Sequence, residues 1–313
     1  MADAKHQEHA TGGHDDHAAH DPLDSTHLVT HVKDADYFEL PRMLGHKQKI
    51  PQPLKQKEPL FELKEQPIEG LIEPLDLKVT KFMVLEVVGA ALIAFVFIGL
   101  AKRIKDGKPA PGRFWNLVEV ILLYIRDEVA RPAIGKHDAR QFMPFVWTLF
   151  FFVLTCNLLG MVPWLGSPTG ALATTGTMAL ITFVVVTVAG MKKLGIAGFW
   201  KAQVPHMDVP GPLLIVLWPA IFLIEIMGLL IKHFVLSVRL LANMMAGHLV
   251  LGVIMAFIAA SAKAGFAIWL GVSFASLGGA TALSMLELFV AFLQAYIFTF
   301  LASLFIGMAV HPH

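Results

Sequence analysis

Long apolar stretches, bounded by charged or proline-rich segments, dominate the chain from residue 82 onward. Several approach or exceed the roughly 20 residues that an α-helix needs to cross a bilayer. They predict spans over about residues 82–101, 142–165 and 175–191, a continuous apolar run over 213–260, and a last helix over about 281–308. The pattern indicates an all-α membrane protein of about five transmembrane helices, with its transmembrane domain over residues 81–313.

Residues 113–131 follow a different pattern, because apolar residues recur there at helical spacing opposite a polar face. The polar face carries Asn116, Glu119, Asp127 and Glu128. A helix with this many charges is too polar to span, so the pattern predicts an amphipathic helix lying flat on the membrane surface. We expect Pro132 and Gly135 to end it.

The apolar run over residues 213–260 is too long for one perpendicular span. At 1.5 Å per residue it would form a helix about 72 Å long, more than twice the bilayer's hydrocarbon core of about 30 Å. No cluster of turn-forming residues divides it, which favours one long, steeply tilted helix over two spans. The glycine-containing segment 261–280 is expected to form the connection to the last helix.

The first 80 residues predict an extramembrane segment that is partly disordered. Residues 1–31 hold seven histidines among Asp, Ala and Gly, and residues 32–80 carry six prolines. Such a composition has too little apolar surface to build a core. A weak metal-binding or pH-responsive tail is the alternative interpretation.

The distribution of Lys and Arg predicts the orientation. Basic residues follow the first span, and Lys192 and Lys193 follow the third, so these ends are assigned to the cytoplasm by the positive-inside rule. The N-terminus is then outside and the C-terminus inside. A formal net charge of +1 gives no indication of nucleic-acid binding. Cys156 is the single cysteine, which excludes an intrachain disulfide and a thiolate metal cage, and we expect no metal or cofactor.

Polar residues inside the 213–260 run are the candidate functional residues. Glu225, Lys232 and Arg239 are seven residues apart and share one stripe of a helix, and Asn243 continues this face one turn beyond Arg239. His248 lies nine residues beyond Arg239, about 180° round and roughly 13 Å along the axis. A charged side chain at membrane depth is costly, so each marks a functional site by default.

The last helix repeats the pattern more sparsely. Glu287 and Gln294 are seven residues apart on one stripe, and Tyr296 lies elsewhere on the surface. If the two long helices run antiparallel, Gln294 pairs with the level of Arg239 and Glu287 with the level of His248. Arg239 would then have no carboxylate in its own chain. A structural interhelical hydrogen bond remains the ordinary interpretation of a residue such as Tyr296.

Three motifs resemble subunit a of F-type ATP synthases, and the resemblance extends over about residues 80–310. They are Arg239-Leu-Leu-Ala-Asn243-Met-Met-Ala-Gly247-His248, Glu287-Leu-Phe-Val-Ala-Phe-Leu-Gln294-Ala-Tyr296 and Asn157-Leu-Leu-Gly160-Met-Val-Pro163. Many bacterial members have the acid and the imidazole exchanged between the two long helices. Some also carry an aspartate where Gly160 stands here.

The resemblance implies a proton-translocating stator subunit whose two long tilted helices pack against a ring of c-subunits. Arg239 would face the ring carboxylates and separate two aqueous half-channels. His248 and Glu287 match the outer half-channel, Glu225 and Lys232 the inner one, and Asn243, Gln294, Asn157 and Tyr296 complete the implied proton pathway. The choice between protons and sodium lies largely with ligands on the ring.

The resemblance also implies the partners and the location. It implies the c-ring, the peripheral-stalk subunit b and the rest of the F1Fo complex, in a bacterial cytoplasmic (inner) membrane rather than an organelle membrane. The chain itself would bind no nucleotide and catalyse no reaction, while supporting proton transport and ATP synthesis by the complex. The alternative function is a stand-alone ion channel or carrier.

Overall fold

The computed structural model describes residues 37–39, 49–51, 80–104, 112–162, 166–204 and 211–311. The expectation for residues 1–80 therefore lies almost wholly outside the described residues. Two short strands in that segment, β1 (Tyr37–Glu39) and β2 (Lys49–Pro51), form an antiparallel pair that the sequence pattern did not predict.

Helices account for nearly all the rest of the described chain, which confirms the all-α membrane class. Five of them are long and apolar enough to span a membrane. These are α2 (Lys81–Arg103), α5 (Ala139–Gly160), α6 (Leu172–Leu194), α8 (Gly211–Ser261) and α9 (Phe266–Val310). Shorter elements are α3 (Arg113–Tyr124), η2 (Ile125–Ala130), α4 (Arg131–Ile134), η3 (Pro168–Gly170) and α7 (Ile196–Ala202).

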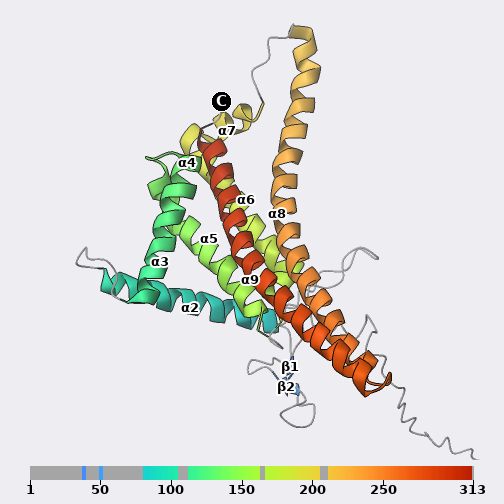
Figure 1. Ribbon diagram of the computed structural model, residues 1–313. Coiled ribbons are helices and arrows are strands. Elements are labelled where there is room, and N and C mark those ends of the chain that lie inside the picture. Colours follow the sequence, from blue (N-terminus) through green and yellow to red (C-terminus); the bar gives the residue numbers. More distant parts are fainter. Residues whose placement is uncertain are drawn as a thin grey trace, which may run out of the picture.

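The predicted amphipathic helix is present and is longer than expected. It runs through α3, the π-helical turn η2 and α4, and it ends at Ile134, so Pro132 does not terminate it. Pro132 follows directly after the π-helical turn η2, where the regular α-helical hydrogen-bond pattern is already interrupted. Figure 1 shows α3 running across the direction of α2. This direction is compatible with the predicted place of the helix on the membrane surface.

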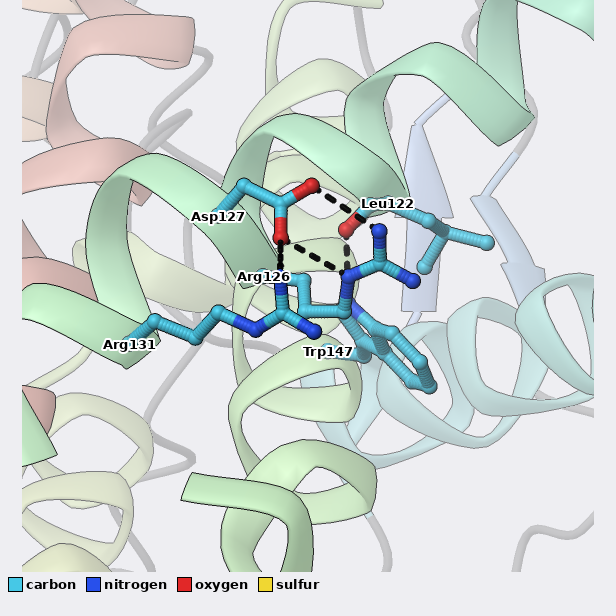
Figure 2. A network of polar contacts seen from close by, with 5 residues as sticks. All are labelled: Leu122, Arg126, Asp127, Arg131 and Trp147. Atoms are coloured by element: carbon cyan, nitrogen blue, oxygen red, sulfur yellow. Dashed lines mark hydrogen bonds and ion pairs between the residues drawn. The ribbon is translucent and has the colours of Figure 1, made fainter. Parts of the chain in front are cut away.

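A polar network holds the middle of this surface helix (Figure 2). Arg126 and Arg131 reach the Asp127 carboxylate at 2.9 Å and 2.5 Å, respectively. The hydrogen bond from Arg126 holds the pKa of the Asp127 carboxyl below its ordinary value, and the charges of both arginines add to this effect. The indole of Trp147 in α5 donates to the carbonyl of Leu122 at 3.0 Å. Together these contacts hold the surface helix in shape and against α5.

Helices α5 and α6 correspond to the second and third predicted spans, with shifted ends, and both pack against α9. Helix α5 ends at Gly160, five residues before the expected boundary, and α6 begins at Leu172, three residues earlier than expected. The short helix η3 lies between them and packs against both. Lys192 and Lys193 lie inside the last turn of α6, where positive charge complements the helix dipole.

Residues 211–261 form one unbroken helix, which confirms the single long helix over the two-span alternative. At 1.5 Å per residue, α8 is about 77 Å long and α9 about 68 Å, so both must be strongly tilted to stay within a bilayer. They are antiparallel neighbours. Figure 1 shows them meeting near their connection and diverging toward the N-terminal end of α8.

The expected connection over residues 261–280 is wrong, since α9 already begins at Phe266. The turn needs only Ala262–Gly265, because Gly265 adopts a φ of 101° that other residues rarely reach. The glycines that follow are accommodated within the helix. A helix satisfies its own backbone hydrogen bonds, which a loop in contact with lipid cannot do.

The core lies where α5, α6, α8 and α9 pack together. Phe298, Leu240 and Val153 are 0% exposed there. At the far end of α9 the backbones approach so closely that a Cβ on Gly307 would overlap the carbonyl oxygen of Ala133 in α4. Gly307 therefore permits the contact that joins the surface helix to the end of α9.

Candidate functional site

Arg239 lies on an outward face of α8. Its side chain is exposed, as are Val235 and Ala242 one turn to either side, while Leu236 and Leu240 on the neighbouring face are buried. Within the part of the chain that the structure describes, no ion pair or hydrogen bond neutralises this guanidinium. A positive charge on an apolar face at membrane depth needs water or a carboxylate on another chain.

Asn243 and Gln294 join the two long helices next to Arg239. The Nδ2 group of Asn243 donates to Oε1 of Gln294 at 2.9 Å, and Gln294 is only 3% exposed. The sequence-based pairing placed Gln294 at the level of Arg239, and the structure places it one helical turn further on. The amide Nε2 of Gln294 is buried without a partner among the described residues, so this group keeps an unused donor beside Arg239.

Glu287 and His248 lie further along the same helix pair. The Glu287 carboxylate lies directly over Gly247, where an added Cβ would overlap Oε1, so it is at the level of the residue preceding His248. This confirms the predicted level. Among the described residues, however, neither His248 Nε2 nor Glu287 Oε1 has a hydrogen-bond partner, and no ion pair joins the two side chains. The absence of a side chain on Gly247 leaves the space that the carboxylate occupies.

Glu225 and Lys232 lie at the opposite end of α8, and both line one large cleft. This cleft has a volume of about 1340 Å³ and opens where α8 diverges from α9 in Figure 1. Its wall also includes Trp218, Lys201 and His311, together with residues of α4, α6, α7 and α9. Glu225 is half-buried and Lys232 exposed. The two predicted inner residues therefore share one space, which is separate from the Glu287 carboxylate.

Asn157 belongs neither to the Glu287 and His248 pair nor to the cleft of Glu225 and Lys232. Its Nδ2 donates to the carbonyl of Ala291 at 3.2 Å, and its Oδ1 accepts from Thr169 at 2.9 Å. Thr169 in turn contacts Ser167 at 2.9 Å. Asn157 is 0% exposed. This geometry joins α5 to α9 and to the α5–α6 connection, which favours an anchoring role for Asn157 over a place in a proton pathway.

Tyr296 lies against the surface helix. Its ring lies 6.3 Å from the ring of Tyr124 in α3 and 6.1 Å from that of Phe300. These contacts support the ordinary interpretation of Tyr296 as a residue that packs α9 against the surface helix.

Several polar contacts were missed by the sequence reasoning. His233 is 4% exposed between the rings of Phe183 and Phe305, and its Nε2 has no partner among the described residues. Its position between Lys232 and Arg239 was the available signal. Glu86 accepts a hydrogen bond from Thr174 at 2.6 Å and so joins α2 to α6. Over the described ranges, no three His, Cys, Asp or Glu side chains gather as a metal site.

Known proteins are similar to this chain over most of its transmembrane domain. The family described as ATP synthase A chain matches residues 83–307. An ATP synthase subunit a of Myxococcus xanthus (strain DK1622) is 40% identical over 253 residues, covering 79% of this chain and 78% of that protein. The ATP synthase subunit a of Chloroherpeton thalassium (strain ATCC 35110 / GB-78) is 38% identical over 244 residues, covering 75% of this chain and 67% of that protein. The chain belongs to the ATP synthase subunit a family.

Proposed function

We propose that this chain is the stator subunit through which protons cross the membrane in a rotary F-type ATP synthase. Family membership supports a proton-translocating Fo subunit. The observation that carries the finer proposal is the position of Arg239. It is exposed on α8 and has no ion-pair partner among the described residues, and one polar group lies to either side of it along the helix.

The spacing of these two polar groups supports two separate half-channels. Lys232 lies seven residues before Arg239, about 10 Å along the helix, and His248 lies nine residues after it, about 13 Å. The cleft around Glu225 and Lys232 would form the inner half-channel. The buried groups of Glu287 and His248, which have no partner in the described part of the chain, would belong to the outer half-channel, because such groups require water or another polar partner.

The mechanism follows from the charge of Arg239. A carboxylate on the neighbouring ring can enter lipid only in its protonated form, because an ionised group at that depth is too costly. Near the guanidinium the ionised form is favoured, so the carboxyl group releases its proton toward the inner cleft before it passes. After it has passed, it receives another proton by way of Glu287 and His248. The fixed charge also opposes direct proton flow between the two half-channels.

The proposal includes an orientation and a set of partners. Helix ends rich in Lys and Arg would face the cytoplasm of a bacterium, with the N-terminus outside and the C-terminus inside. The exposed face of α8 around Arg239 would contact the c-ring. A peripheral stalk containing subunit b would hold the chain against the rest of the complex. Nucleotide chemistry would belong to other subunits.

A stand-alone channel or carrier is the competing function, and reconstitution of the full chain distinguishes the two. The chain alone in liposomes under an imposed pH gradient and a membrane potential is expected to give a proton flux no greater than that of empty liposomes. The reason is that Arg239 separates the two half-channels when no ring carboxylate carries protons past it. A pH-sensitive dye inside the liposomes measures the flux.

The complete complex in the same lipid serves as the positive control, because ATP should drive proton movement in it. A flux from the chain alone that rises with its density in the membrane would contradict the stator proposal and support a channel.

A further inference from the structure

A second charged cluster joins the ends of three helices near the C-terminus. Asp138 directly precedes α5, Lys193 lies in the last turn of α6, and His311 directly follows α9. The Asp138 carboxylate lies 3.0 Å from Lys193 Nζ and 3.0 Å from His311 Nε2. The Asp138 carboxylate therefore holds the His311 imidazole at the C-terminal end of α9.

His311 also lies in the wall of the cleft that contains Glu225 and Lys232. Asp138 and Lys193 instead line a separate hollow of about 390 Å³ between α5 and α6. The His311 side chain is 56% exposed, and that of Asp138 is 19% exposed. The imidazole thus lies between the ion cluster and the mouth of the cleft, in contact with both.

The carboxylate beside His311 stays ionised near neutral pH. The hydrogen bond from Lys193 holds the pKa of Asp138 below its ordinary value, and the nearby positive charges add to this effect. A lowered carboxyl pKa means that Asp138 stays ionised until the solution is more acidic than for a free aspartate. Two lysines, Lys201 and Lys232, also line the cleft. Histidine is the side chain whose ordinary titration range includes neutral pH.

Two further titratable groups complete this neighbourhood. Glu225 lines the cleft itself and supplies a carboxylate there. His137 lies 3.8 Å from Asp138, but its side chain is fully exposed and it is not part of the cleft wall. His311 is therefore the imidazole placed to transfer protons between the solution and the cleft.

We propose that His311 is a proton-exchange residue at the mouth of the inner half-channel. The neutral imidazole accepts a proton from a buffer acid in the cytoplasm, becomes an imidazolium beside the Asp138 carboxylate, and returns to neutral when it releases the proton into the cleft toward Glu225. During ATP synthesis the same steps run in reverse. This inference rests on the proposed function, because it needs protons to pass through the cleft.

The experiment uses the complete ATP synthase in inverted membrane vesicles, with His311→Gln compared with the unaltered chain. A glutamine amide can still donate a hydrogen bond to Asp138 but cannot carry a proton. ATP-driven acidification of the vesicle interior is measured in dilute and in concentrated impermeant zwitterionic buffer that titrates near neutrality. We expect a several-fold slower initial rate in dilute buffer and recovery in concentrated buffer, because mobile buffer then delivers protons directly to the cleft.

The matched control is His137→Gln, which removes an imidazole near the same carboxylate but outside the cleft, and its rate is expected to equal that of the unaltered chain. An equal loss for His311→Gln at both buffer concentrations would assign His311 a purely structural role and overturn the proposal. An unchanged rate in dilute buffer would overturn it as well. Either result would leave the loss expected for Arg239→Ala intact, so failure of this inference is distinguishable from failure of the proposed function.

Discussion

Replacing Arg239 with alanine is expected to reduce ATP-driven proton pumping to background while the complex still assembles. The side chain is exposed on α8, whereas Leu236 and Leu240 beside it form the packing against the rest of the domain. Truncation of Arg239 therefore removes a charge without opening a cavity. A ring carboxyl group would then have no cation to favour its ionised form, so it could pass the stator with its proton still bound.

The measurement is acidification of inverted vesicles at equal content of assembled complex. Arg239→Lys adds a second comparison: it keeps the charge but loses the planar fork of the guanidinium, so impaired rather than normal pumping is expected. Lys263→Ala is the control, because it removes an exposed positive charge from the α8–α9 connection instead. Normal pumping by Arg239→Ala would show that the residue has no part in coupling.

Glu287→Gln is expected to slow pumping by roughly tenfold or more without abolishing it. The substitution preserves the shape of a side chain that fits over Gly247, but it removes the transferable proton. A positioned acid or base typically contributes about 10²–10⁴ to a proton-transfer rate, and water can replace part of this contribution. The loss should therefore be large but smaller than that for Arg239→Ala.

Initial pumping rates over a range of internal pH test this expectation. Because the glutamine cannot titrate, the dependence of the rate on pH inside the vesicles should change as well as its size. Glu128→Gln supplies the control, since Glu128 is an exposed carboxylate on the surface helix. If Glu287→Gln retained both the rate and the pH profile of the unaltered chain, Glu287 would have no place in the proton pathway.

The long helices were predictable because an uninterrupted run of apolar residues can be recognised from the sequence of that segment alone. The apolar run over 213–260 has no turn cluster, and the structure forms a single helix there. The seven-residue spacing of Glu287 and Gln294 on an antiparallel neighbour predicted their levels to within about one turn. The start of α9 was not predictable in the same way, because glycines that break helices in water are tolerated in a membrane.

Contacts between distant segments were the part that the sequence did not reveal. The Asp138–Lys193–His311 cluster combines three helix ends separated by more than 50 residues at each step, and no spacing rule connects them. Asn157 belongs to a matching motif, yet only the three-dimensional contacts indicate that its amide holds α5 to α9. The cleft around Glu225 depends on the divergence of α8 from α9, which is a property of packing rather than of composition.

The contact between Arg239 and the ring is tested most directly by disulfide cross-linking. Ala242 lies one turn from Arg239 on the same exposed face, and a disulfide requires Cβ atoms about 3.5–4.5 Å apart. Ala242→Cys, paired with a cysteine beside the ring carboxylate, is expected to form a cross-linked product under mild oxidation. Leu240→Cys, at a position 0% exposed on the packed face, should not. A ring that cross-links equally at both positions, or at neither, would contradict the assignment of this face of α8 as the stator surface.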